Sequence, residues 1–292
     1  MADQSGPGPD MFSRFGVADL STPSSALISS SKYLNNPMLR EAMATALLRR
    51  NGRDRRVGWD SQHIVRAYWE VRDTGRINAM LKEARVADAK LDAWFEERHI
   101  STFRRDDLKK YPPDSLGGVF HAYLVSQNLD IDLDPNLRRD PNWRPDTDLQ
   151  YWELRSAQTH DFEHLLAGVG FDYLGEMAPF WMRIENYFAH LDAELAGELA
   201  AVHLLLVLPM FTRTMLHYPR AWTALTEYTR HATELGRRSG PLYMAKYEDL
   251  FELTLPQARL KLGMGEVPEY DTMALSDYWS EGAQSNPEIK AM

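Results

Sequence analysis

Apolar residues recur at the three- and four-residue steps of an α-helix through most of this chain. The pattern is clear in residues 38–50, 61–70, 77–97 and 117–127, and each stretch is long enough for a helix. Alternating β-branched and polar residues, which a half-buried strand requires, are scarce. We therefore predict an all-α fold, with a single multi-helix domain spanning residues 38–264. With 292 residues and 44% hydrophobic content, the chain can bury a substantial core.

The two ends of the chain differ from this pattern. Residues 1–37 are rich in Ser, Gly and Pro, and residues 265–292 are acidic and aperiodic. We predict disordered or irregular tails at both ends. The N-terminal stretch has neither the apolar centre of a signal peptide nor the arginine-rich composition of a transit peptide.

Composition excludes several classes of function. The net charge of -9 argues against a nucleic-acid partner, because binding to phosphates needs an excess of cations. With no cysteine, the chain has no disulfide, no thiolate nucleophile and no cysteine-based metal site. Walker A, GxGxxG and GxSxG motifs are absent from the sequence, which removes the simplest nucleotide-binding and serine-hydrolase interpretations.

The most apolar stretch covers residues 199–211 and includes His203 and Pro209. It is shorter than the roughly 20 residues that a membrane-spanning helix needs. We predict a buried helix that does not cross a bilayer, with a lipid-facing helix as the alternative.

A histidine-containing helix is predicted after the charged, proline-containing residues 130–144, which read as a loop. It should begin near Asp146 or Thr147, which are good N-cap residues, and end at Gly168. Two histidines continue its apolar stripe, which places them on the inward face. The stripe consists of Leu149, Trp152, Ser156, His160 and His164.

Four potential metal ligands gather around the end of this helix. His160 and His164 are one helical turn apart, Asp161 lies between them, and eleven residues separate His164 from Glu176. The glycines in residues 168–170 predict a chain reversal, after which a helix begins around residues 173–177. At about 1.5 Å per residue, His164 and Glu176 then each lie roughly 6 to 9 Å along their helices from the turn. Two imidazoles with carboxylates suit Zn²⁺ best, and Fe²⁺ or Mn²⁺ are compatible.

Spacing alone leaves two interpretations of this cluster open. An inward histidine is more often a hydrogen-bonded core residue than a metal ligand, whereas four buried titratable groups without an ion would carry a high desolvation cost. Asp161 or Glu176 could instead carry protons without binding metal. We expect Glu163 to face solvent, with a role as acid or base as the alternative. We treat the remaining histidines as structural: His63, His99, His121, His190, His203, His217 and His231.

At this cluster the sequence resembles the ubiquinone (coenzyme Q) biosynthesis protein 4 family, whose signature is HDxxHx11E. The signature is met by His160, Asp161, His164 and Glu176. Further matching positions are Ile100, Ser101, Ser115, Leu116, Gly117, Gly236, Arg237, Arg238, Tyr247, Glu248, Leu262 and Gly263. The chain departs from the family at Gly118, Val119 and Phe120, where many members have Arg, Glu and Tyr, and at Phe251, where Trp is common.

The resemblance implies an all-α protein that acts on a polyprenylated benzoquinone precursor. The implied reaction removes the C1 carboxylate of a polyprenylated hydroxybenzoate, with or without oxygen insertion at that carbon. The four signature residues would bind zinc, and Asp161 and Glu176 would be catalytic. The implied partners are other ubiquinone biosynthesis proteins, a membrane surface and a second copy in a homodimer. The implied location is bacterial, cytoplasmic and peripheral on the inner membrane.

Two other classes of function are weighed beside this enzyme. A non-catalytic scaffold would bind prenylated intermediates and organise the biosynthetic proteins, with a purely structural metal. A phosphohydrolase of the HD type is less favoured, because that class expects a further upstream histidine and a distant aspartate. An isoprenoid groove is expected along Phe180, Trp181, Ile184 and residues 199–211, unless these residues simply form the core.

Overall fold

The computed structural model describes residues 29–48, 58–131, 135–140, 142–272 and 274. Within these residues the regular structure is helical, and the only β-type pairing is an isolated bridge between Ser115 and Thr254. The all-α prediction is confirmed. The α-helices are α2 (Lys32–Asn35), α3 (Pro37–Leu48), α4 (Gly58–Val71), α5 (Thr74–Ala87), α6 (Ala89–Glu97), α7 (Leu116–Ser126), α8 (Pro135–Arg139), α9 (Asp148–Ala167), α10 (Met177–His190), α11 (Ala193–His217), α12 (Trp222–Arg238) and α13 (Leu255–Lys261). Short 3-10 helices are η1 (Arg105–Lys110), η2 (Pro219–Ala221), η3 (Leu242–Met244) and η4 (Tyr247–Leu250).

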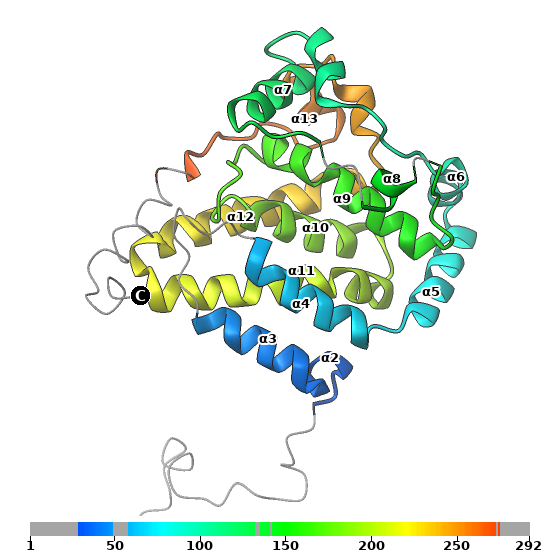
Figure 1. The fold of residues 1–292 in the computed structure, drawn as a ribbon, viewed down its shortest axis with the longest axis vertical. Helices are drawn as coiled ribbons and strands as arrows, with labels where there is room; N and C mark the ends of the chain where they lie inside the picture. Colours follow the sequence, from blue (N-terminus) through cyan, green and yellow to red (C-terminus); the bar gives the residue numbers. More distant parts are fainter. Residues whose placement is uncertain (1–28, 49–57, 132–134, 141, 273, 275–292) are drawn as a thin grey trace, which may run out of the picture.

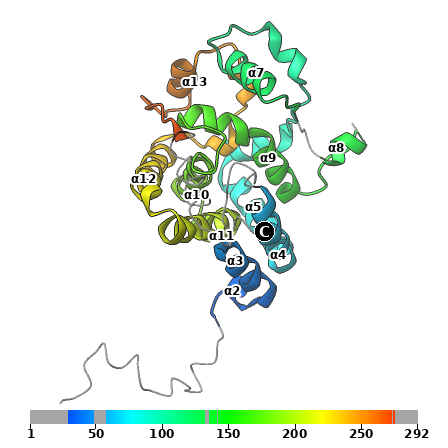
Figure 2. The same cartoon turned by 60° about the vertical axis from the view of Figure 1, so that its left-hand side comes forward.

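Helix α10 lies at the centre of the fold and packs against α9, α11 and α12 (Figure 1). The N-terminal helices α3 and α4 pack on α11, and α5 packs on both α9 and α11. At the opposite end of the molecule, α7 and α13 pack against α9 (Figure 2). Helices α9 and α10 therefore have neighbours on several sides, which removes most of their side chains from water.

Two predicted elements differ from the structure. Residues 77–97 form two helices, because Asp88 leaves helical geometry and its carboxylate accepts hydrogen bonds from Lys90 N and Leu91 N. Such a side chain caps a new helix better than it continues an old one. Residues 130–144 were predicted as a loop, yet α8 forms within them, with a proline at its first position.

The predicted bounds of the histidine helix are confirmed in α9. The side chain of Thr147 accepts a hydrogen bond from Gln150 N, which satisfies one free donor of the first turn. At the other end Gly168 adopts φ +70, a left-handed conformation that favours glycine. The sequence signals at both ends are thus realised as helix caps.

Helix α11 is longer than the apolar stretch that predicted it. It has 25 residues, and by length and composition it meets the requirements for crossing a membrane. The prediction that it is too short was wrong, because residues 193–198 and 212–217 extend the helix on both sides. Within the fold, 61% of its most apolar window is buried, as in the core helix of a globular protein.

Parts of both predicted tails pack onto the described domain. Lys32 in α2 forms an ion pair with Glu198 of α11, with Nζ and Oε1 2.8 Å apart. At the other end, Thr272 is only 1% exposed. Residues 1–28, 273 and 275–292 of the predicted tails lie outside the described residues. The domain limits at 38 and 264 remain predictions.

Candidate metal centre

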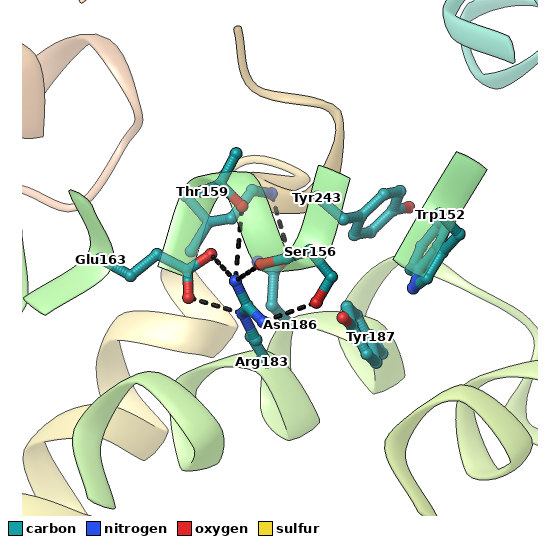
Figure 3. A pocket seen from close by; sticks show the side chains of 9 residues that line it. Trp152, Ser156, Thr159, Glu163, Arg183, Asn186, Tyr187 and Tyr243 are labelled. Atoms are coloured by element: carbon teal, nitrogen blue, oxygen red, sulfur yellow. Dashed lines mark hydrogen bonds and ion pairs between the residues drawn. The ribbon is translucent and has the colours of Figure 1, made fainter. Parts of the chain in front are cut away.

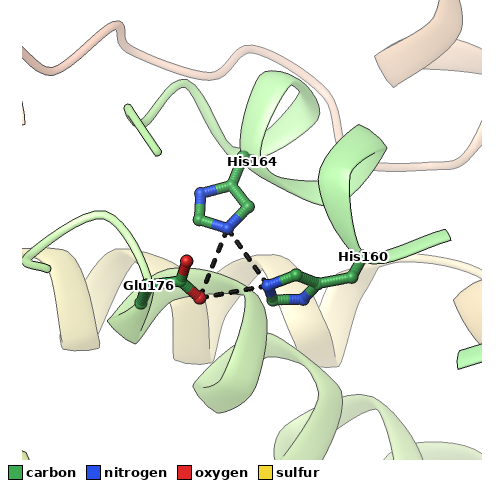
Figure 4. A group of neighbouring side chains, drawn as sticks. All are labelled: His160, His164 and Glu176. Atoms are coloured by element: carbon green, nitrogen blue, oxygen red, sulfur yellow. Dashed lines mark hydrogen bonds and ion pairs between the residues drawn. The ribbon is translucent and has the colours of Figure 1, made fainter. Parts of the chain in front are cut away.

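His160, His164 and Glu176 converge beside the turn between α9 and α10 (Figure 4). The Nε2 atom of His160 lies 3.0 Å from Glu176 Oε2 and 3.3 Å from His164 Nε2. His164 Nε2 and Glu176 Oε2 are 3.6 Å apart. Each side chain thus offers one ligand atom to a common point.

These separations fit a tetrahedral metal ion. Ligand bonds of 2.0–2.1 Å at tetrahedral angles place neighbouring donor atoms about 3.3 Å apart. The three measured separations bracket this value. Two imidazoles and one carboxylate also form the borderline donor set that zinc accepts, with a fourth position left for water or substrate.

The cluster is open on one side and closed on the other. The side chain of His164 is fully buried, whereas those of His160 and Glu176 are 21% and 19% exposed. Burial acts to raise the pKa of Glu176, but His164 and His160 hold that pKa well below its usual range. Burial acts to lower the pKa of His164, yet the Glu176 carboxylate raises that pKa overall. Glu176 is therefore an anion that draws positive charge to this point.

Local structure orients His164 and favours the negative charge of Glu176. His164 Nδ1 lies 2.8 Å from the carbonyl oxygen of Gly170, which can only accept. The neutral ring therefore carries its proton on Nδ1 and directs the lone pair of Nε2 toward the cluster. Glu176 occupies the N-cap position of α10, where the helix dipole favours a negative charge.

Asp161 does not join the other predicted ligands. Its side chain is exposed, and the group whose donor atoms lie within 4.8 Å of one another contains only His160, His164 and Glu176. One residue along a helix turns a side chain by about 100°. Asp161 therefore points away from the face that carries the two histidines.

Glu163 is buried, so the expectation that it faces solvent was wrong. It is 2% exposed, and its Oε2 accepts a 2.6 Å hydrogen bond from Arg183 Nε in α10. Arg183 also donates to Ser156 Oγ at 2.6 Å and to Thr159 Oγ1 at 3.3 Å (Figure 3). Because α9 has neighbours on several sides, the face that periodicity assigned to water is covered by α10.

Phe180 of α10 packs against His160, one of the two partly exposed members of the cluster. Phe180 stacks on His160 at 5.3 Å between ring centroids and on His203 at 5.7 Å. Trp181 is partly buried and donates to Thr233 Oγ1, and Ile184 is buried. Of the residues expected to line an isoprenoid groove, these three pack in the core, as the alternative interpretation held.

Three other positions of family resemblance, Ser101, Gly236 and Glu248, lie at joints between elements. Glu248 forms an ion pair with Arg155 of α9, with Oε1 and Nη1 3.0 Å apart, and accepts a hydrogen bond from Ser101. A Cβ atom at Gly236 would lie 2.4 Å from Met182 O, so the contact between α12 and α10 requires a glycine. These positions build the scaffold around α9 and α10.

Sequence reasoning missed Arg183, Arg155 and Thr272, all of which are buried. Arginines on helices that otherwise read as amphipathic resemble surface residues, and only their contacts with Glu163 and Glu248 distinguish them. Thr272 lies in a segment without periodicity, so no sequence signal indicated that it packs near the cluster.

A model of the family described as coenzyme Q (ubiquinone) biosynthesis protein Coq4 matches residues 96–268. The mitochondrial ubiquinone biosynthesis protein COQ4 homologue of Drosophila ananassae is 27% identical over 166 residues, which cover 57% of this chain and 56% of the relative. The corresponding protein of Phaeosphaeria nodorum is 26% identical, with 57% and 51% covered. The matches therefore span little more than half of these relatives.

A crystal structure of a Nostoc punctiforme protein named for ubiquinone biosynthesis shares the fold, with a TM-score of 0.54. It is 19% identical, and the alignment covers 80% of this chain and 99% of that chain. The shared fold thus extends beyond the residues that the family model matches.

Proposed function

The chain belongs to the Coq4 family of coenzyme Q (ubiquinone) biosynthesis proteins, and we propose that it removes the C1 carboxylate of a polyprenylated hydroxybenzoate. The observation that carries this proposal is the convergence of His160, His164 and Glu176 at tetrahedral spacing on a partly open face. The family match supplies the pathway, and the cluster supplies a place for metal-assisted chemistry.

The residues of the cluster would hold one divalent ion. Zn²⁺ fits this donor set best, with Fe²⁺ or Mn²⁺ as alternatives. When bound, such an ion supplies Lewis acidity that stabilises negative charge on a substrate oxygen as the ring loses CO2. His164 fixes the buried side of the site, while the exposed edges of His160 and Glu176 leave room for a substrate to approach.

Loss of CO2 breaks the bond between the ring and its carboxylate and leaves the electron pair on C1, which then takes a proton. Oxygen insertion instead requires O2 and a redox-active ion such as iron or manganese, because zinc has no redox chemistry. Glu176 lies in the ligand group, so its catalytic role is to hold the ion. The exposed Asp161, next to His160, is better placed to exchange a proton with solvent than to bind metal.

The scaffold remains the second candidate, since an ion held across the turn between α9 and α10 would also brace the hairpin. In that case metal removal would unfold or loosen the protein, and no catalytic activity would be lost because a scaffold has none. The enzyme proposal instead requires that a folded variant without the ion forms no decarboxylated product.

The test compares Glu176→Gln with Glu234→Gln, a control that changes an exposed carboxylate in α12. Protein purified without added metal is first subjected to elemental analysis. Each variant is then incubated with a polyprenylated hydroxybenzoate, and the decarboxylated product is measured by mass spectrometry. We expect near-stoichiometric metal and product formation in the wild type and the control, and neither in folded Glu176→Gln. A wild-type protein with no ion near stoichiometry would remove the metalloenzyme proposal.

We further propose that the protein associates with other ubiquinone biosynthesis proteins and with a second copy in a homodimer. We also propose that it binds peripherally to a membrane, which is the inner membrane if the chain is bacterial. The support for membrane binding is an exposed apolar row on α11: Leu204, Leu208, Met215 and Leu216. Co-sedimentation with phospholipid vesicles should decrease in Leu208→Glu and Leu216→Glu. Equal sedimentation of these variants and the wild type would exclude this face.

A further inference from the structure

Residues 266–272, which we call the C-terminal strap, cross the turn between α9 and α10. The backbone N–H of Tyr270 donates to Gly168 O at 2.7 Å, and Glu269 accepts from Arg259 Nη2 at 2.6 Å. A Cβ atom at Gly168 would lie 2.2 Å from Pro268 O. The strap therefore contacts the backbone of the turn directly, and this approach excludes a side chain at Gly168.

The end of the strap holds the turn through one hydroxyl group. Thr272 Oγ1 accepts a hydrogen bond from Gly170 N at 3.0 Å and donates to Asp172 Oδ2. The other carboxylate oxygen of Asp172 accepts from Leu174 N at 3.1 Å and Gly175 N at 3.2 Å. Thr272 and Asp172 are both buried, so water does not compete readily for these bonds.

Gly170, whose N–H is bonded to Thr272, is also the residue that orients His164. Gly170 presents its N–H to Thr272 and its carbonyl oxygen to His164 Nδ1. A Cβ atom at Gly170 would lie 2.6 Å from Asp172 Oδ2 and 2.8 Å from Thr272 Oγ1, so the neighbouring groups enclose this glycine. A chain of hydrogen bonds thus leads from the strap to a predicted metal ligand.

We propose that Thr272, together with Asp172, is a positioning residue that fixes the ring of His164 with its proton on Nδ1. The role of this ring as a ligand rests on the proposed function, while the positioning itself does not. Without the hydroxyl, Gly170 loses the contact that fixes its carbonyl, and the proton of His164 can move to Nε2. The lone pair that faces the cluster is then lost in part of the molecules.

The test compares Thr272→Val, which keeps the shape and removes the hydroxyl, with Thr272→Ser, which keeps the hydroxyl. The matched control is Thr214→Val, at a buried threonine whose hydroxyl donates to Met210 O of its own helix α11. Asp172→Asn tests the same chain of bonds from its other end. The readouts are the ¹⁵N shifts of the two His164 ring nitrogens in metal-free full-length protein, above the pKa of the ring, and zinc affinity by competition with a chelator. Thermal unfolding verifies that each variant is folded.

We expect His164 to carry its proton on Nδ1 in the wild type, Thr272→Ser and Thr214→Val, and to mix both tautomers in Thr272→Val and Asp172→Asn. Zinc affinity should fall about 10-fold in Thr272→Val, the lower end of losses for residues that orient ligands. Unchanged ring nitrogens in Thr272→Val overturn the proposal, whatever happens to zinc affinity. If the wild type binds no zinc, the proposed function fails, and the tautomer comparison alone decides the role of Thr272.

Discussion

Two ionisable clusters join the same pair of helices, α9 and α10, and they differ in how completely they are satisfied. Glu163 and Arg183 are 2% and 5% exposed, and they pair with each other and with neighbouring hydroxyl and carbonyl groups. His160 and Glu176 are partly exposed, His164 is buried, and the three side chains present one donor atom each to one point. One cluster is complete, and the other has room for a further atom.

This difference distinguishes buried charges that stabilise the fold from buried charges that can bind a further group. In the first cluster the two charges neutralise each other, so removing one partner leaves the other stranded. In the second cluster, two ring nitrogens lie 3.3 Å apart, an arrangement that a shared cation satisfies better than a single proton. A buried carboxylate is therefore informative about function only when its partners leave something unmatched.

The largest expected effect is the loss of stability on breaking the complete pair. Arg183→Met should lower the free energy of unfolding by about 3–5 kcal/mol, because Glu163 would remain buried without a partner. Urea denaturation measures this loss. The matched control is Arg237→Met, which breaks a more exposed pair with Glu185 and should cost less than about 1 kcal/mol. Similar losses in both variants would contradict the contrast between the clusters.

The next effect concerns stabilisation by metal at the incomplete cluster. In wild-type protein, free zinc at 100 times its Kd should raise the free energy of unfolding by about 2.7 kcal/mol. In Glu176→Gln the gain should be nearly absent, since one of three ligands has lost its charge. Thermal unfolding with zinc and with a chelator measures the difference. An equal gain in both proteins would show that zinc binds elsewhere.

A smaller effect is expected in acid, at the joint between Glu248 and Arg155. Burial opposes charge on Glu248, yet His99, Arg155 and Ser101 hold its pKa well below the ordinary value of 4.5. A depressed pKa gives stability that is present above pH 4.5 and is lost as pH falls through the lower folded-state value. As pH falls from 5 to the pH at which the protein unfolds in acid, the free energy of unfolding should decrease by about 1–2 kcal/mol less in Glu248→Gln than in the wild type. Parallel acid-unfolding curves would contradict this assignment.

The smallest effect is expected at Asp161, which the sequence placed among the ligands. Asp161→Asn should change zinc affinity by only about 0.5 kcal/mol, or roughly two-fold, as is usual for an exposed residue. Chelator competition measures this against Glu176→Gln. A loss of ten-fold or more would return Asp161 to the ligand set and extend the incomplete cluster to four protein groups.

Periodicity and capping signals predicted the fold class, the bounds of α9 and the reversal after Gly168, because these depend on local backbone preferences. They also predicted that His164 faces inward. The position of Glu163 could not be predicted, since its burial depends on Arg183 from the next helix. The role of Thr272 was equally hidden, because its partner Asp172 lies 100 residues away along the chain. Contacts between distant segments leave no periodic signal.

The three donor atoms come from residues only 16 positions apart, joined by a single short connection between α9 and α10. Bringing such close residues together requires closing only a small loop, which costs little chain entropy and is fast compared with long-range pairing. Local contacts of the α9–α10 hairpin therefore bring the three side chains near one another, whereas the contact of Thr272 with Gly170 joins residues 102 positions apart.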